Sequence, residues 1–245
     1  MVTMFDPLLE EMMPATYVLV PGAWHGGWAW QPVARRLRAA GHDAVTVTPP
    51  GLADGDPRAG LRLADAIDHV VAEVDRRHLD DVVLVAHSWG GYPVTGAAQR
   101  LKDRVSRVVY VNALVPAPGV PMIDENAEYS RMLRAAIDAS PDGSVAVVLE
   151  QMPVLMHDQP EALQSLVFEL LVPQPGGYFL DALEGPDVVA LGIPATYILG
   201  EDDRTLARPG AEFAARIGLT PIMISGSHET LLTRPDEVAQ AILRA

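Results

Sequence analysis

The sequence predicts an α/β protein with a mostly parallel central sheet, helices on both faces of the sheet and a helical cap insertion. Short runs rich in β-branched residues alternate with longer amphipathic patterns along most of the chain, which is typical of strand–helix–strand units. Most of the short runs are apolar throughout, as expected for strands that helices cover on both sides. One proline-rich segment with helical patterns interrupts the alternation, and we interpret it as the cap.

The composition is that of a globular protein. The chain has 245 residues, of which 49% are hydrophobic and 20% are charged, enough for one large α/β domain. Eighteen basic against 32 acidic residues give a formal net charge of −14, which would repel phosphate backbones and anionic lipids. We therefore expect neither nucleic acid nor a membrane as a partner. The absence of cysteine excludes disulfides, cysteine metal sites and a thiol nucleophile.

The sequence also favours a cytoplasmic protein. No run approaches the roughly 18 apolar residues that a membrane-spanning helix needs. Residues 1–15 read as an N-terminal arm, because they lack a basic leader region and because Glu10 and Glu11 interrupt their apolar residues. The sequence does not indicate an oligomeric state.

The elements of the core follow one another in a regular order. Strands are predicted at residues 16–20, 44–48, 82–86, 105–112, 196–199 and 221–225. The first helix is predicted over 32–40, with Pro32 in its first turn and Gly41 at its end. In the next helix, apolar residues recur at helical spacing from Leu63 to Val74. An amphipathic helix over 235–243 ends the chain.

The domain boundaries are placed where the regular alternation of strands and helices stops and where it resumes. We expect the core to be formed by residues 1–116 and 189–245, and the cap by residues 117–188. Helical patterns in the cap lie near residues 126–139, 144–151 and 160–171.

Methionines make the cap a candidate wall for a substrate pocket, because thioether side chains adapt to irregular ligands. We predict that Met122, Met152 and Met156 bind substrate together with Trp24 from the core. The alternative is an ordinary helical subdomain in which the methionines only fill a core.

A nucleophile is predicted where an apolar strand runs into a helix through the segment VVLVAHSWGG. This segment has the form of a nucleophile elbow with Ala86 in place of the first glycine. The turn lifts the serine hydroxyl above the sheet, and the close approach of strand and helix requires small residues such as Ala86 and Gly90. A serine that merely caps a helix needs neither the small neighbours nor the strand. Ser88 is therefore the predicted nucleophile.

A serine nucleophile needs a base, and His228 is the best candidate. It follows the last predicted strand and precedes the last helix, which places it at the same edge of the sheet as Ser88. We expect kcat/KM to fall at low pH with a midpoint near the ordinary histidine pKa of about 6.5. His25 and His87 are predicted to lie next to the catalytic residues without taking part in the reaction. The other histidines are expected to be solvated: His42, His69, His78 and His157.

The carboxylate that orients the base is expected just after the strand at 196–199. Three acids follow one another there, Glu201, Asp202 and Asp203, and the chain order serine, acid, histidine is the one expected for such a fold. The position after the strand does not choose among the three.

Backbone N–H groups for an oxyanion hole are predicted at Ala23 and Trp89. Ala23 lies in the glycine-rich loop after the first strand, and Trp89 directly follows the nucleophile. Neither a phosphate-binding loop nor a dinucleotide-binding glycine pattern is present, and the seven histidines are scattered. We therefore expect no cofactor and no metal.

Five segments together resemble the α/β-hydrolase fold: VLVPGAWHGGWAW, AHSWGG, YVNALVPAPG, YILGEDDR and GSHETLLTRPDEVA. The resemblance covers about residues 16–245 and is to small capped bacterial esterases similar to plant methyl-ester hydrolases and hydroxynitrile lyases. It implies a serine carboxylesterase-type hydrolase that cleaves a small, mainly apolar ester, thioester or lactone through an acyl-enzyme on Ser88. In this family the acid directly precedes a basic residue, here Arg204, which selects Asp203. Pro21 departs from the family, which commonly has histidine there.

Two other functions fit the same resemblance. A lyase could use Ser88 and His228 without acylation, but the hydroxynitrile lyases carry threonine at the position of Gly22 and lysine at that of Glu229. A ligand-binding homologue without activity would have lost a member of the triad, and none is missing from the sequence.

Overall fold

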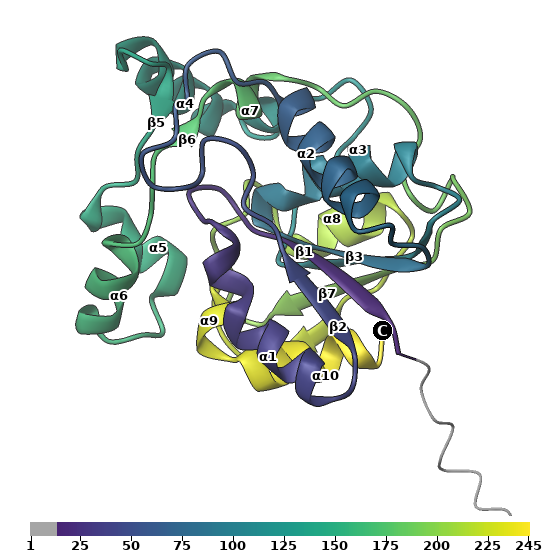
Figure 1. Ribbon diagram of the computed structural model, residues 1–245. Coiled ribbons are helices and arrows are strands. Elements are labelled where there is room, and N and C mark those ends of the chain that lie inside the picture. The colour runs from purple at the N-terminus through teal and green to yellow at the C-terminus, as the bar shows by residue number, and fades with distance from the viewer. Residues whose placement is uncertain (1–13) are drawn as a thin grey trace, which may run out of the picture.

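Six parallel strands form the central sheet of the computed structural model, which describes residues 14–245 (Figure 1). The predicted N-terminal arm lies almost entirely outside the described residues. The sheet order is β2-β1-β3-β4-β7-β8, and every neighbouring pair is parallel. The strands are β1 (Thr16–Val20), β2 (Asp43–Thr46), β3 (Val82–His87), β4 (Val105–Val111), β7 (Ala195–Gly200) and β8 (Ile222–Ile224).

Helices cover both faces of the sheet, as predicted (Figure 1). On one face lie α1 (Gln31–Ala39), α9 (Thr230–Thr233) and α10 (Pro235–Leu243). On the other lie α2 (Leu63–Arg76), α3 (Gly91–Arg100) and α8 (Gly210–Arg216). Each face of the sheet packs against its helices in a separate hydrophobic core. Successive residues of β1 point alternately into these two cores, since Val18 packs on the side of α2 and Leu19 on the side of α1.

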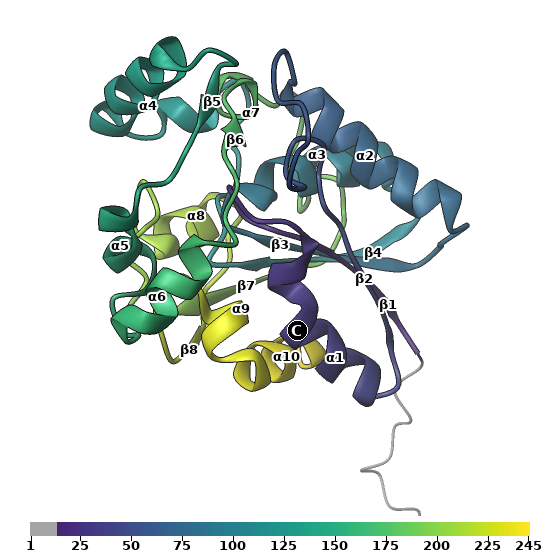
Figure 2. The same ribbon diagram turned by 60° about the vertical axis from the view of Figure 1, so that its left-hand side comes forward.

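The segment expected to form the cap lies between β4 and β7. It contains α4 (Ala127–Ala139), β5 (Ser144–Val145), α5 (Met152–Met156), α6 (Glu161–Phe168), β6 (Gln174–Pro175) and α7 (Gly177–Leu180). Figure 2 shows these elements gathered beyond one edge of the sheet. We call residues 117–188 the cap segment.

One prediction for the cap segment is wrong. Residues 144–151 do not form a helix, because β5 pairs antiparallel with β6 and only Leu149–Gln151 forms a short 3-10 helix. The chain leaves α4 at Ser140, whose backbone is extended, and Gly143 then precedes β5 with a left-handed φ of 68°. Val145 therefore takes part in a strand pairing that the sequence pattern does not reveal.

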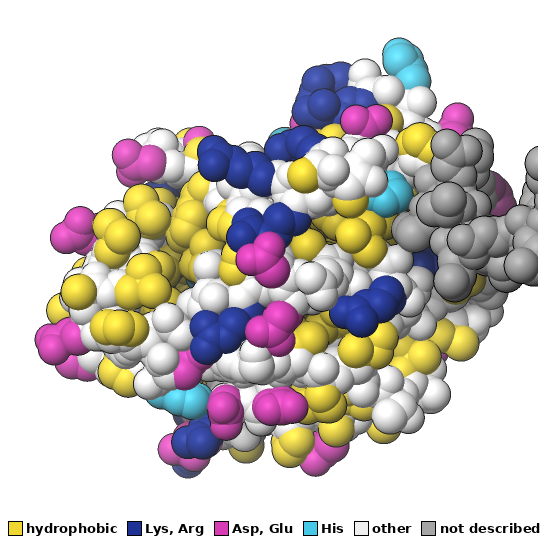
Figure 3. Space-filling model, turned by 90° about the horizontal axis from the view of Figure 1, so that it is seen from below, with side chains coloured by type: hydrophobic (Ala, Val, Ile, Leu, Met, Phe, Trp, Pro, Cys, Tyr) yellow, Lys and Arg dark blue, Asp and Glu magenta, His cyan; other side chains and the backbone are white. Residues whose placement is uncertain are grey.

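Most of the exposed large hydrophobic side chains belong to the cap segment. Leu166 and Leu170, at and just after the end of α6, are 56% and 48% exposed. In Figure 3, apolar side chains gather at the end of the molecule that carries α5 and α6, whereas charges of both signs lie over the helices under the sheet. Within residues 14–245 no helix is both long and apolar enough to cross a membrane.

Candidate active site

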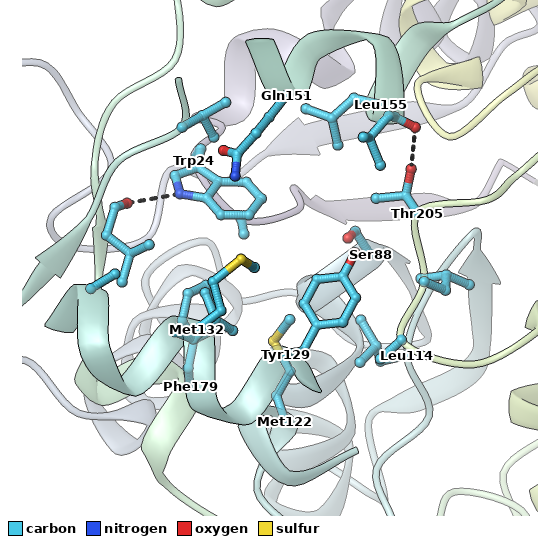
Figure 4. Close-up of a pocket in the computed structure, with 18 of the residues that line it drawn as sticks. Trp24, Ser88, Leu114, Met122, Tyr129, Met132, Gln151, Leu155, Phe179 and Thr205 are labelled. Carbon is cyan, nitrogen blue, oxygen red and sulfur yellow. Dashed lines mark hydrogen bonds between the residues drawn. The ribbon is translucent and has the colours of Figure 1, made fainter. Parts of the chain in front are cut away.

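Ser88 lies at the sharp turn between β3 and α3. Its φ of 51° is left-handed, an uncommon conformation for a residue other than glycine. The backbone on both sides holds this turn, since the Ser88 N–H donates to the Asn112 carbonyl at 3.2 Å and the Ser88 carbonyl accepts from the Leu114 N–H at 3.0 Å. The strained turn points the side chain into a pocket, where Figure 4 shows it.

The small residues around the serine are required by the path of β1. A Cβ atom on Gly90 would lie 2.6 Å from the Pro21 carbonyl oxygen and 2.9 Å from that of Val20. Ala86, the other small position of the elbow, is completely buried. The elbow therefore packs directly against the end of β1, which brings the glycine-rich loop to Ser88.

His228 and Asp203 form a hydrogen-bonded pair at the same edge of the sheet. The distance from His228 Nδ1 to Asp203 Oδ2 is 2.9 Å, and both side chains are buried. The Thr205 N–H donates to the other carboxylate oxygen of Asp203 at 2.9 Å. Asp202, by contrast, is exposed and lies 3.8 Å from Arg204. Of the acids after β7, Asp203 is the one that the structure brings to the histidine.

The pair shifts the pKa values of both partners in opposite directions. Burial alone would lower the pKa of His228, but the Asp203 carboxylate outweighs burial and raises this pKa above its ordinary value. Burial alone would raise the pKa of Asp203, but His228 and the hydrogen bond from Thr205 lower it. The carboxylate is thus ionised at neutral pH and favours the imidazolium form of its partner.

We predict that kcat/KM falls on an acid limb whose midpoint lies above about 6.5. Only neutral His228 accepts the serine proton, so activity rises with pH through the raised pKa of this histidine. This expected midpoint is higher than the one expected from the sequence alone. Initial rates at subsaturating ester from pH 5 to 9 measure it, and a profile that is flat down to pH 5 would contradict the assignment.

Two further histidines pack behind the pair, as predicted for His25 and His87. The His87 ring lies 4.7 Å from the His228 ring, and His87 Nε2 is 3.1 Å from the His228 carbonyl oxygen. Burial holds the pKa of His87 well below its ordinary value, so this ring is neutral. His25 Nε2 lies 3.6 Å from a carboxylate oxygen of the buried Glu229. His42 is not solvated as expected: it is buried, and its Nδ1 accepts the Ala15 N–H.

Three buried side chains come close enough to share a metal ion. His87, His228 and Glu229 each place one ligand atom within 4.8 Å of the others. His228 uses Nδ1 for Asp203, so a metal would have to take the nitrogen that a serine hydrolase needs as its base. We keep the prediction of a metal-free site.

The two N–H groups predicted for the oxyanion hole belong to Ala23 and Trp89. Neither donates a hydrogen bond to another group within residues 14–245, so both are free for a ligand. Ala23 borders the pocket beside Ser88. The sequence places Trp89 one residue after the serine, at the start of the turn into α3.

Asn112, which follows β4 and connects the segments of the site, was not predicted from the sequence. This completely buried residue donates from Nδ2 to the His228 carbonyl at 2.9 Å and accepts the Gly200 N–H on Oδ1 at 2.7 Å. Its own carbonyl accepts the Ser88 N–H. A polar residue directly after the apolar run 108–111 of a central strand was the available signal.

The pocket above Ser88 is a largely apolar cavity of about 190 Å³ (Figure 4). No Asp, Glu, Lys, Arg or His side chain lines it among the described residues. Trp24 and Met122 lie in its wall, as predicted, and so does Met132. Met152 and Met156 do not: both are completely buried in a small core between α5 and α6. For these two residues the alternative reading, methionine as core filler, is correct.

A serine on a strand–helix elbow, a buried histidine–aspartate pair at the same sheet edge and two free N–H groups are the parts of a serine hydrolase. The chain belongs to the alpha/beta hydrolase family, whose model matches residues 17–241. The fold and the family predicted from the sequence are both confirmed.

Individual relatives agree with this placement. The chain is 30% identical to a carbendazim hydrolyzing esterase of Nocardioides sp. (strain SG-4G), over 93% of this chain and 98% of that one. It is 26% identical to methylesterase 18 of Arabidopsis thaliana, over 94% and 96%. An extracellular α/β-hydrolase from a Paenibacillus species superposes with a TM-score of 0.89, at 24% identity over 95% and 99% of the two chains, and shows that the fold is shared.

Proposed function

We propose that this protein is a serine esterase that cleaves a small, uncharged, mainly apolar carboxylic ester through an acyl-enzyme on Ser88. The observation that carries the proposal is the buried contact between His228 and Asp203 at the sheet edge where Ser88 enters an apolar pocket. The relatives named above, a carbendazim hydrolyzing esterase and a plant methylesterase, support ester hydrolysis.

In the proposed reaction each catalytic group acts once when the acyl-enzyme forms and once when it is hydrolysed. The Ser88 hydroxyl attacks the ester carbonyl carbon while His228 takes its proton. The resulting oxyanion accepts hydrogen bonds from the N–H groups of Ala23 and Trp89. Collapse breaks the bond to the alcohol, which leaves with the proton from His228. Water then attacks the acyl-enzyme by the same route, releases the acid and restores the serine.

The pocket lining supports an uncharged substrate. A carboxylate or ammonium group in a cavity without an ionised partner would lose its hydration with little in return. Aromatic walls suit a flat or branched apolar group, since Trp24 packs edge-on against Phe179 with ring centroids 6.1 Å apart.

The structure offers little support for the lyase alternative. A Cβ atom at Gly22 would lie 2.8 Å from both Ser88 Cβ and His87 Nδ1, so a threonine there has no space without movement. Glu229 is buried at the position where a lyase of this family has lysine, so its side chain supplies no cation for a departing cyanide.

A matched set of probes tests the proposal. We expect the phenyl ester of butyric acid to be cleaved with a kcat/KM at least about 100-fold above that of the singly anionic phenyl succinate, because no Lys, Arg or His among the described residues lines the cavity. A fluorophosphonate should add once to the protein, with the added mass on the peptide that contains Ser88. Mandelonitrile should release no measurable cyanide. Phosphonylation elsewhere, or cyanide release faster than ester cleavage, would contradict the proposal.

Two further inferences accompany this function. We propose that residues 117–188 act as the cap of the pocket, since Met122, Tyr129 and Leu155 of this segment line it. The cytoplasmic location stays a prediction from the sequence.

A further inference from the structure

Trp24 lies in a turn that requires a left-handed φ, a conformation that tryptophan disfavours. The His25 N–H donates to the Gly22 carbonyl at 3.4 Å, which closes a four-residue turn, and Trp24 at the third position has a φ of 67°. Because Ala23 before it is not among the residues of positive φ, the positive φ of Trp24 indicates a type II turn, in which glycine is preferred at this position. In a type I turn Trp24 would have a favourable negative φ. The central peptide of the turn, between Ala23 and Trp24, would then be rotated, so that its N–H and its carbonyl point in the opposite directions.

Two hydrogen bonds hold this central peptide in the type II orientation. Its N–H, from Trp24, donates to the side-chain Oε1 of Gln174 at 2.8 Å. Its carbonyl, from Ala23, is 2.7 Å from His25 Nδ1. Turning the peptide over would break both bonds in a buried place, where unpaired polar groups are costly.

Gln174 reaches this peptide from the cap segment. It is completely buried, and its side-chain nitrogen has no partner among the described residues, so its bond to Trp24 is the polar contact that its side chain makes. In the antiparallel pair of β5 and β6, Gln174 lies opposite Val145. The carbonyl of that same Val145 accepts the Trp24 indole N–H at 2.8 Å, a bond drawn in Figure 4. The Trp24 carbonyl accepts the Val172 N–H at 3.0 Å.

All three polar groups of Trp24 are therefore bonded to the two strands of the cap segment or the residues beside them. Ala23, one residue earlier, carries the N–H proposed for the oxyanion hole. The dihedral angles that change when a type II turn becomes type I are ψ of Ala23 and φ of Trp24. The shape of the loop that presents the Ala23 N–H thus depends on a bond from the cap.

We propose that Gln174 is a positioning residue for the oxyanion hole, which acts from the cap segment through the backbone of Trp24. This proposal rests on the proposed esterase function. It assigns the β5–β6 strand pair a second task besides closing the pocket: it holds in one conformation the disfavoured turn that carries the Ala23 N–H.

The decisive variant is Gln174→Met, which keeps the length and burial of the side chain and removes the acceptor. We expect kcat to fall by roughly 10- to 100-fold with KM nearly unchanged, because loss of one oxyanion donor costs about 100- to 1000-fold and the donor here is displaced rather than removed. Affinity for an aryl trifluoromethyl ketone, which forms a tetrahedral oxyanion with the serine, should fall by the same factor. Gln164→Met is the matched control, since the Gln164 side chain donates to the Met156 and Gln159 carbonyls of the cap segment, away from the turn at Trp24.

Two more variants separate positioning from simple damage to the fold. Gln174→Glu keeps an acceptor oxygen and should restore most of the activity. In a Trp24→Gly background the turn carries no left-handed penalty, so the loss caused by Gln174→Met should shrink by about tenfold. Equal losses in Gln174→Met and Gln174→Glu, or an undiminished loss in the glycine background, would overturn the proposal.

Wild-type measurements keep this test separate from the proposed function. If the unaltered protein cleaves phenyl butyrate and carries the phosphonate on Ser88, the esterase function stands whatever Gln174 does. Unchanged kcat and unchanged ketone affinity in folded Gln174→Met would then contradict the positioning role alone.

Discussion

Replacing Ser88 with alanine should remove nearly all ester turnover, by a factor on the order of 10⁵ to 10⁶ in kcat. The hydroxyl starts the covalent step, and no cysteine is available to substitute for it. The fold should remain, because the turn is held by the backbone bonds of Ser88 to Asn112 and Leu114, which alanine keeps. Progress curves with phenyl butyrate and a thermal unfolding curve measure the two parts of this expectation.

Ser106→Ala is a matched control, because Ser106 lies near the amino end of β4, whereas Ser88 lies at the carboxyl ends of the strands. Its activity should equal that of the wild type. The double variant Ser88→Ala with His228→Ala should be little worse than Ser88→Ala alone, since the two groups act as one unit. Turnover near the wild-type rate in folded Ser88→Ala would exclude the acyl-enzyme.

Replacing Asp203 with asparagine should lower kcat by about 10⁴-fold. Asparagine can present an amide N–H to His228 Nδ1, which fixes the wrong tautomer, and it removes the charge that stabilises the imidazolium. The same loss of charge lowers the pKa of His228, so any residual activity should have an acid limb at lower pH than the wild type. A pH series of kcat/KM on the variant measures both effects.

Asp202→Asn provides the comparison at the neighbouring position. Its exposed carboxylate faces Arg204 at 3.8 Å, so its replacement should change kcat by less than about threefold. If the two variants exchanged their effects, the acid would be Asp202 and the serine mechanism would still hold.

The core of the fold could be predicted because its signals are local. Residues 16–20 and 235–243 have the predicted bounds, since an apolar β-branched run and an amphipathic stripe with proline in its first turn are complete within a few residues. The strands β5 and β6 have two residues each and exist through their pairing. Nothing in a window around Val145 reveals its distant partner Gln174.

The functional site, like the fold, could be predicted from the sequence only in part. Ser88 and His228 follow from the elbow and from the end of a strand, but position alone left three acids open. Resemblance to a family selected Asp203, and the 2.9 Å contact to His228 gives the physical reason. Met152 and Met156 were misplaced because side chains on one short helix can face a pocket or a core, and only packing decides between them. Asn112 was missed because its partners Ser88, Gly200 and His228 come from three separate segments of the chain.

The bonds between Trp24 and the strands of the cap segment bear on how this enzyme can be engineered. Exchanging residues 117–188 for the corresponding insertion of a relative is an obvious way to change substrate choice, since the insertion enters after β4 and leaves before β7. A graft without an acceptor at the place of Gln174 would give a chimera that still binds esters and turns them over slowly. Transplanted caps should therefore be designed together with residue 24, either by keeping the glutamine or by placing glycine in the turn.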